Sequence, residues 1–175
     1  MTTKKVQILR AGLQLFATEG YTATSTNKIA VRADVSEGLI FRHFHSKEGL
    51  LEAIIAEGES AFHELYADIL DETNPKAVIR RVINLPLNIP EEHYEFWRLQ
   101  HRLKWELSLY NPEKSLPLLQ KLARSFKMLG YHQPEDEAVF LSDYLEGLAG
   151  QILLGRPVNK EATRSFLLSK YSLSE

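Results

Sequence analysis

Two histidines and two tryptophans recur every four residues in segment 91–110: His93, Trp97, His101 and Trp105. In a helix this spacing puts all four on one slowly winding stripe. Histidine can bind a metal ion or move a proton, and tryptophan can line an apolar pocket. However, His93 and His101 would be two turns apart, about 12 Å along the helix axis, which is too far for one ion. The stripe therefore predicts either a pocket wall or ordinary helix packing, and no metal site.

The chain lacks the usual groups of covalent catalysis. It has no cysteine, which excludes a disulfide framework, a cysteine-ligated zinc site and a thiol nucleophile. No nucleophile–base pair or metal-ligand spacing is visible, so an enzyme using the stripe is the weaker interpretation. We expect no enzymatic activity, no cofactor and no bound metal.

Charge is unevenly distributed along the 175 residues, although the net charge is only −2. Residues 1–50 contain seven Lys and Arg against four acids, and the remaining residues contain fourteen against nineteen. Such asymmetry suggests a nucleic-acid-binding N-terminal segment, and statistical scatter is the alternative. No apolar run approaches the ~18 residues of a membrane span, so we expect no membrane association.

The apolar spacing and the caps predict an all-α protein of about nine helices. In residues 4–19, five residues share one helix face: Ile8, Ala11, Gly12, Leu15 and Phe16. The other helices are predicted at 25–33, 36–44, 46–70, from 75 to before Pro86, 91–110, 112–129, 134–154 and 159–171. We expect a bend at Pro117, because proline disrupts a helix interior.

The second and third predicted helices are short and joined by Ala33-Asp34-Val35-Ser36. This arrangement predicts a helix-turn-helix, in which the later helix enters the major groove of DNA. Val35 would fill the angle between the helices and Ser36 would cap the second of them. Asp34 would occupy the turn, because Asp tolerates the left-handed conformation. An ordinary helical hairpin is the alternative.

These residues resemble the tetracycline-repressor (TetR) family of bacterial transcription regulators over about residues 6–55. The family pattern is Gly-x-Leu/Ile-Tyr-x-His/Tyr-Phe followed by Ser/Asn-Lys-Glu-x-Leu. The chain matches it from Gly38 to Leu50, except that Phe41 replaces the usual Tyr and removes a phosphate-bonding hydroxyl. Residues 56–175 have no signature of their own but fit the family's all-helical plan.

The resemblance implies roles for individual residues. Thr26 would bond a phosphate and Asn27 a base edge. Lys47 would clamp one phosphate together with the free N–H groups of the fourth helix. Glu37 would be either a cytosine reader or, as we favour, a neutral surface residue. The implied DNA-binding residues are Thr26, Asn27, Ser36, Gly38, Leu39, Phe41, Arg42, His43 and Lys47.

The resemblance divides the chain into a DNA-binding domain, residues 1–46, and an effector-binding and dimerisation domain, residues 47–175. The expected dimer interface comprises Leu141, Leu145, Leu148, Ile152, Phe166 and Leu167, although packing within one subunit would account for about half of these. The expected effector pocket comprises Phe62, Tyr66, Trp97, His101, Trp105, Phe126 and Tyr144.

The resemblance thus implies a bacterial, cytoplasmic, nucleoid-associated regulator that is a repressor. It would bind a two-fold-related operator in double-stranded DNA as a homodimer. An apolar or aromatic small molecule would release it from the operator. A regulator of the same fold controlled by a protein partner is the alternative.

Overall fold

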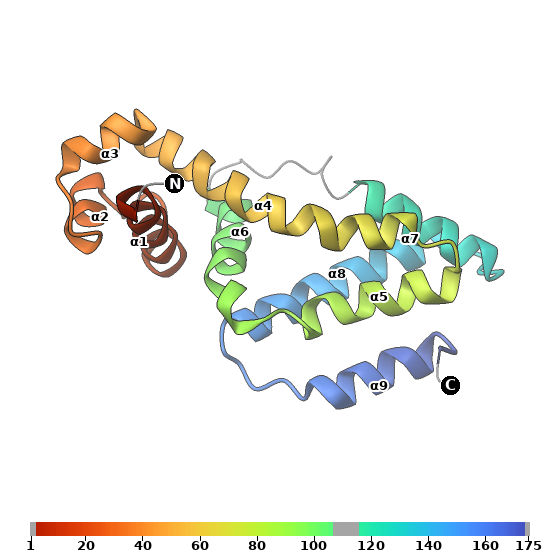
Figure 1. Cartoon of the computed structure of the whole chain (residues 1–175). Coiled ribbons are helices and arrows are strands. Elements are labelled where there is room, and N and C mark those ends of the chain that lie inside the picture. Colours follow the sequence, from red (N-terminus) through yellow and green to blue (C-terminus); the bar gives the residue numbers. More distant parts are fainter. Residues whose placement is uncertain (1–2, 107–115, 174–175) are drawn as a thin grey trace. The chain divides into compact units, whose positions relative to one another are not determined.

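The computed structural model describes residues 3–106 and 116–173, apart from the side chains of residues 59–65 and 104–106. These residues form nine α-helices, one short 3-10 helix and no strand, which confirms the all-α class (Figure 1). Internal contacts divide the chain into two compact units: Met1–His63 with Glu92–Tyr110, and Glu64–Glu91 with Asn111–Glu175. The predicted boundary at residue 46 separates a DNA-binding domain from an effector-binding and dimerisation domain. The division into compact units does not test these roles, so the boundary stays a prediction.

The first unit is built around α1 (Thr3–Glu19). It also contains α2 (Thr26–Arg32), α3 (Glu37–Phe44), the first part of α4 (Lys47–Asp71) and α6 (Tyr94–Glu106), and the 3-10 helix η1 (Glu91–His93) precedes α6. The predicted inner face of α1 is buried, as expected. It shares one core with side chains of the other helices: Ile29, Ile40, Phe44, Leu50, Leu99 and Leu103.

Several predicted helix boundaries depend on residues that the structure places as expected. Gly20 and Asp34 both have positive φ, 97° and 52°, so the turns after α1 and α2 use the left-handed region. The Ser46 hydroxyl caps α4 by accepting the Gly49 N–H at 3.0 Å. Ser36 lies at the N-cap of α3, but its side chain makes no capping hydrogen bond, so that part of the prediction is wrong.

The junction between α3 and α4 has no room for a side chain at Gly49. A Cβ atom there would lie 2.1 Å from the carbonyl oxygen of Phe44. His45, which links the two helices, has φ of 68°, a conformation that non-glycine residues rarely adopt. The link between α3 and α4 is therefore tightly constrained.

The second unit is a helical body. It contains the end of α4, α5 (Pro75–Leu87), α7 (Leu116–Met128), α8 (Pro134–Leu153) and α9 (Lys160–Lys170). Helix α5 contacts α7, α8 and α9, and α7 contacts α8 (Figure 1). Five fully buried side chains form much of its interior: Ile79, Ile83, Leu122, Phe126 and Leu141.

One proline differs from its predicted effect. Helix α5 continues through Pro86 to Leu87, so the expected end before Pro86 is wrong. Proline costs least near a helix end, because few backbone hydrogen bonds follow it. Pro117 is the second described residue of α7, and the residues before Leu116, which the expected bend would involve, lie outside the described part of the chain.

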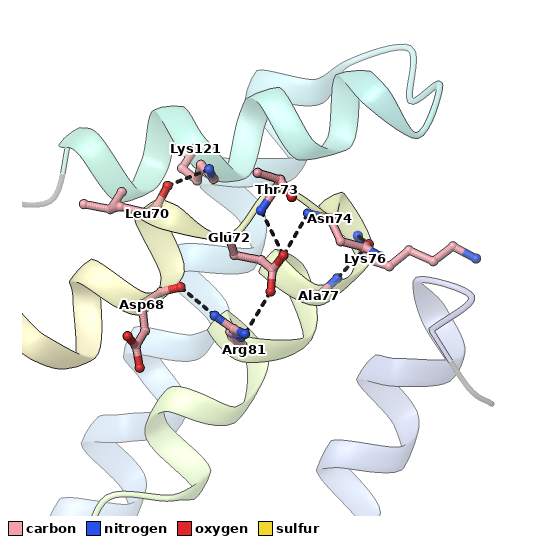
Figure 2. Close-up of polar contacts among 9 residues, drawn as sticks. All are labelled: Asp68, Leu70, Glu72, Thr73, Asn74, Lys76, Ala77, Arg81 and Lys121. Atoms are coloured by element: carbon pink, nitrogen blue, oxygen red, sulfur yellow. Dashed lines mark hydrogen bonds and ion pairs between the residues drawn. The ribbon is translucent and has the colours of Figure 1, made fainter.

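The C-terminal end of α4 is held by two cations from neighbouring helices (Figure 2). The Arg81 guanidinium donates to the Asp68 carbonyl at 2.5 Å, and the Lys121 ammonium donates to the Leu70 carbonyl at 2.6 Å. The last carbonyls of a helix lack partners within it and carry partial negative charge. Arg81 from α5 and Lys121 from α7 therefore stabilise this end of α4.

Glu72 organises the turn between α4 and α5 (Figure 2). Its carboxylate accepts the backbone N–H groups of Thr73 at 2.8 Å and Asn74 at 2.9 Å, and it pairs with Arg81 at 2.8 Å. The hydrogen bond from the Asn74 N–H is the main cause that lowers the pKa of Glu72 below its ordinary value of 4.5. Because the folded state favours the charged carboxylate, this contribution to stability is present above that value.

We expect Glu72→Gln to lower the free energy of unfolding at pH 7. The difference from wild type should shrink as the pH falls below about 4.5, because Glu72 then takes up a proton in the unfolded chain and, at still lower pH, in the folded protein. Denaturant unfolding at a series of pH values measures this difference. Glu57→Gln, which neutralises an exposed acid elsewhere on α4, is the control. A difference that persists unchanged to pH 3 would contradict the assigned role.

Candidate nucleic-acid interface

Helices α2 and α3 are short, and their buried residues determine which face is exposed. Ile29, Ile40 and Phe44 are at most 5% exposed, and the Val35 N–H bonds the Ala30 carbonyl at 3.0 Å across the turn. All nine predicted DNA-binding residues are at least partly exposed. The Phe41 ring is 44% exposed, which is unusual for a large apolar side chain and fits contact with another molecule.

An open hollow of about 450 Å³ brings three of the predicted residues together. Thr26 comes from α2, Phe41 from α3 and Lys47 from α4. The hollow is completed by Thr22, Ala23, Thr24, Ser25, Ser46 and Glu48. Hydroxyl groups and one ammonium are the types of donor that bind a phosphate of the DNA backbone.

Lys47 is positioned by a residue that the sequence analysis missed. Its ammonium lies 4.2 Å from the centre of the Tyr21 ring, a cation–π contact. The Tyr21 hydroxyl donates to Glu48 at 2.9 Å, and the ring also lies against Phe16. Burial, followed by the hydrogen bond to Glu48, raises the pKa of Tyr21 to about 12. The signal in the sequence was an aromatic residue directly after Gly20.

The start of α4 has fewer free N–H groups than a full phosphate clamp would use. Ser46 occupies the Gly49 N–H. Hydrogen bonding from its own backbone N–H is the main cause that lowers the pKa of Glu48, followed by the hydrogen bond from Tyr21. An acid therefore occupies part of the hollow in the free protein, so phosphate binding here would require the Glu48 side chain to move.

Other polar side chains of α2 are engaged within the first unit. The Thr26 hydroxyl donates to the carboxylate of Glu37 at 2.5 Å. Lys28 pairs with Glu19, and Arg32 donates to Gln14, so both cations are held on α1. These side chains of α2 are therefore hydrogen-bonded within the subunit, and Lys28 also has an acidic partner.

The outer residues of α3 leave open space around them. A Cβ atom added at Gly38 would meet nothing within 4 Å, so the rest of the subunit does not require glycine there. Arg42 is exposed and His43 is half-buried. A second hollow of about 430 Å³ lies beside His43 and extends to Lys5 and Glu52.

The predicted effector residues fall in different parts of the fold. Trp97 and His101 are partly buried on α6 in the first unit, and Tyr66 and Tyr144 belong to the second unit. The side chains of Phe62 and Trp105 lie outside the described residues. The structure therefore leaves this group as a prediction.

Phe126 has a structural role in the second unit. It is fully buried, and its ring centre lies 4.9 Å from that of Tyr131 and 5.2 Å from that of Tyr171. Burial is the main cause that raises the pKa values of both tyrosines. The ring of Phe126 is thus part of the core of this unit.

Most of the predicted dimer residues are buried within their own subunit. Leu141, Leu145, Leu148, Ile152 and Leu167 are at most 9% exposed. Phe166 differs, because its side chain is 60% exposed. Three apolar residues of α8 are also exposed: Val139, Phe140 and Tyr144. We call these four residues the apolar stripe, and each of them is accessible to a partner.

Two further features limit the chemistry of the molecule. Within the described residues, no group of three or more His, Cys, Asp or Glu side chains could hold a metal ion. None of the helices in this part of the chain combines the length and the apolar run needed to cross a membrane.

Sequence comparison identifies the same region. The family model described as "Bacterial regulatory proteins, tetR family" matches residues 8–54, from α1 into α4. The uncharacterised HTH-type transcriptional regulator YvkB of Bacillus subtilis (strain 168) is 42% identical over 72 residues, which cover 37% of this chain and 38% of YvkB. The chain spans between 34% and 61% of the length of the first three curated relatives that it matches.

Solved structures share the whole fold. A TetR-like transcriptional regulator from Rhodococcus sp. RHA1 matches with a TM-score of 0.81 at 23% identity, covering 97% of this chain and 93% of that one. A putative transcriptional regulator from Saccharomonospora viridis, solved in complex with choline, matches with a TM-score of 0.71 at 26% identity, covering 97% and 95%.

The turn at Asp34, the exposed face of α3 and the hollow beside Lys47 define a helix-turn-helix protein. The matches above assign this region to a family. Residues 8–54 belong to the TetR family of bacterial regulatory proteins, and the described fold is that of TetR-like regulators.

We expect Tyr21→Leu to weaken binding to duplex DNA about two- to fivefold, because an exposed cation–π contact is worth ~0.5–1 kcal/mol. Tyr21→Phe keeps the ring beneath Lys47 and should change the affinity by less than about twofold. Fluorescence anisotropy with a duplex that the wild type selects from random-sequence DNA measures both. Equal losses in the two variants would assign the effect to the hydroxyl and its bond to Glu48, and would contradict a role for the ring.

Proposed function

We propose that this protein is a DNA-binding transcriptional regulator that acts as a repressor. The observation that carries the proposal is the open hollow that Thr26, Phe41 and Lys47 line together from three different helices. Asn27, Gly38, Leu39, Arg42 and His43 are the remaining groove-facing residues of the proposal, together with Ser36 at the turn. A bacterial cytoplasmic location near the nucleoid follows from this function.

The proposed regulator binds a two-fold-related operator as a homodimer. One recognition helix covers a single half-site, so two linked DNA-binding domains are needed to bind the operator specifically. The apolar stripe supports this proposal, because it leaves four large apolar side chains exposed on α8 and α9. The Lys170 ammonium lies 5.5 Å from the centre of the Phe140 ring, which joins the α9 and α8 parts of the stripe.

A small molecule is the proposed effector. The relative from Saccharomonospora viridis was solved with choline, which supports a small-molecule ligand in a protein of this fold. Trp97 and His101, both partly exposed on α6, are the side chains of the first unit proposed to contact it. An apolar or aromatic ligand is the class that such side chains favour.

Helix α4 is the proposed route from effector to DNA. Its first residues belong to the first unit and its last residues to the second. Ser46 fixes its start, and Arg81 and Lys121 fix its end. An effector that binds one arrangement of the second unit more tightly would increase the population of that arrangement. In the dimer this would change the distance between the two DNA-binding domains, so that they no longer match successive major grooves. Control by a protein partner remains the second candidate, and an effector-independent operator affinity would favour it.

We expect Lys47→Ala to weaken binding to both selected and random-sequence duplexes. Because one phosphate contact is lost, the slope of log affinity against log salt should become shallower by about one unit. Anisotropy titrations over a range of salt concentrations measure this slope. Lys76→Ala removes the same charge from an exposed position on α5 and should leave the slope unchanged. A loss confined to one DNA sequence would contradict the phosphate role, and no duplex binding by the wild type would overturn the proposed function.

We expect Phe140→Glu and Phe166→Glu to convert a dimer into a monomer, because each buries a charge in an apolar interface. Light scattering should give the wild type twice the 20.0 kDa of one chain and the variants one such mass. Met128→Glu alters another exposed apolar side chain, on α7, and should remain dimeric. A wild-type protein that is monomeric at micromolar concentration would remove the stripe as the interface.

A further inference from the structure

Thr26 and Glu37 form a direct link between the two helices of the helix-turn-helix. Each is the first residue of its helix, and the Thr26 hydroxyl donates to the Glu37 carboxylate at 2.5 Å. Both side chains are half-buried. Glu37 is therefore not the neutral surface residue that the sequence favoured, because its carboxylate holds the one hydroxyl proton of Thr26.

This bond conflicts with the role proposed for Thr26. A threonine hydroxyl has a single proton, and while that proton is given to Glu37 the residue has only lone pairs to present to a phosphate. The Glu37 carboxylate would also repel a phosphate nearby. Among the described residues, no Lys, Arg or His pairs with Glu37, because the cations of α2 are engaged by Glu19 and Gln14. The free protein thus holds its phosphate donor in an inactive arrangement.

Release of Thr26 requires another hydrogen-bond donor for Glu37. A carboxylate that is ionised only accepts hydrogen bonds, and leaving it without a donor at a protein–DNA interface is costly. The DNA backbone offers no donor to it. In the major groove, donors directed outward from the bases are the amino groups of cytosine (N4) and adenine (N6). Of the groups that DNA presents, only a base of this kind can replace Thr26 as the direct partner of Glu37.

We propose that Glu37 is a specificity-determining residue that couples base recognition to phosphate binding, an inference that rests on the proposed DNA-binding function. At a site with a suitably placed amino group, the carboxylate accepts from the base and the Thr26 hydroxyl turns to the phosphate. At any other sequence both contacts fail together, and the carboxylate repels the backbone. Specificity then arises from rejection of the wrong sequences as well as attraction to the right one.

Binding to two duplexes tests this coupling. The first duplex is selected by the wild type from random-sequence DNA, and the second is an unselected random-sequence duplex of the same length. Glu37→Ala should bind the random duplex more tightly and reduce the ratio of the two affinities about tenfold, the order of one lost base contact. Repeated selection with this variant should lose a cytosine or adenine preference at one position of each half-site.

Glu37→Gln is the conservative variant and keeps an acceptor oxygen for Thr26. Its amide suits the N6 and N7 atoms of adenine, so selection should shift from cytosine towards adenine at that position. A wild-type preference for cytosine or for adenine identifies which amino group Glu37 uses. If Glu37→Ala changes the selected base at no position of the half-site, the inference is overturned.

Asp34→Asn is the matched charge control, because Asp34 is an exposed acid of the same turn and Asn also tolerates a positive φ. It should raise the affinity for both duplexes by the same factor and leave their ratio unchanged. If Glu37→Ala behaves in the same way, Glu37 acts only through its charge and the inference fails, although the proposed function stands. If the wild type binds no duplex, both fail.

A double-mutant cycle separates coupling from independent effects. On the random duplex, Thr26→Ala should cost little affinity when Glu37 is present, because the hydroxyl is already occupied. In the Glu37→Ala background the same change should cost several-fold, because the hydroxyl is then free to bond a phosphate. Equal costs in both backgrounds would overturn the coupling of the two residues.

Discussion

Burial of Ile29, Ile40 and Phe44 against α1 is the constraint on which the DNA-binding surface depends. Helices of seven and eight residues are not stable in water by themselves, so α2 and α3 exist only because this core holds them. Because the same burial determines the rotation of each helix, it also determines which side chains face outward. The exposed ring of Phe41 and the open space at Gly38 are consequences of that rotation.

Several polar side chains of the outward surface already have partners within the subunit in the free protein. Glu37 holds Thr26, and Lys28 and Arg32 are held on α1, while Tyr21 positions Lys47 towards the hollow. Binding to DNA would therefore proceed as an exchange of partners more than as attraction between bulk charges. This agrees with the small positive charge of residues 1–50, since hydrogen bonds to backbone and bases must then supply much of the affinity.

Local features of the fold were predictable from the sequence, whereas side-chain partners distant in sequence were not. The inner face of α1, the turn at Asp34 and the cap at Ser46 depend on residues a few positions apart. Tyr21 and Glu48 are 27 residues apart, and nothing in their spacing reveals the bond between them. Helix α8 shows a second limit, because it has apolar residues on two faces. The sequence did not indicate that Leu141 would face the subunit core while Phe140 stays exposed.

The absence of room at Gly49 has a mechanical consequence. The Phe44 carbonyl oxygen occupies the place where a side chain at Gly49 would begin, so the end of α3 lies directly against the backbone of α4. We expect this close-packed elbow, formed by the end of α3 and the start of α4, to carry α3 along when α4 moves. Rotation of α4 would therefore reorient the recognition helix α3 directly. Substitutions at the outward positions of α3 could change the DNA sequence that is read and leave the elbow intact.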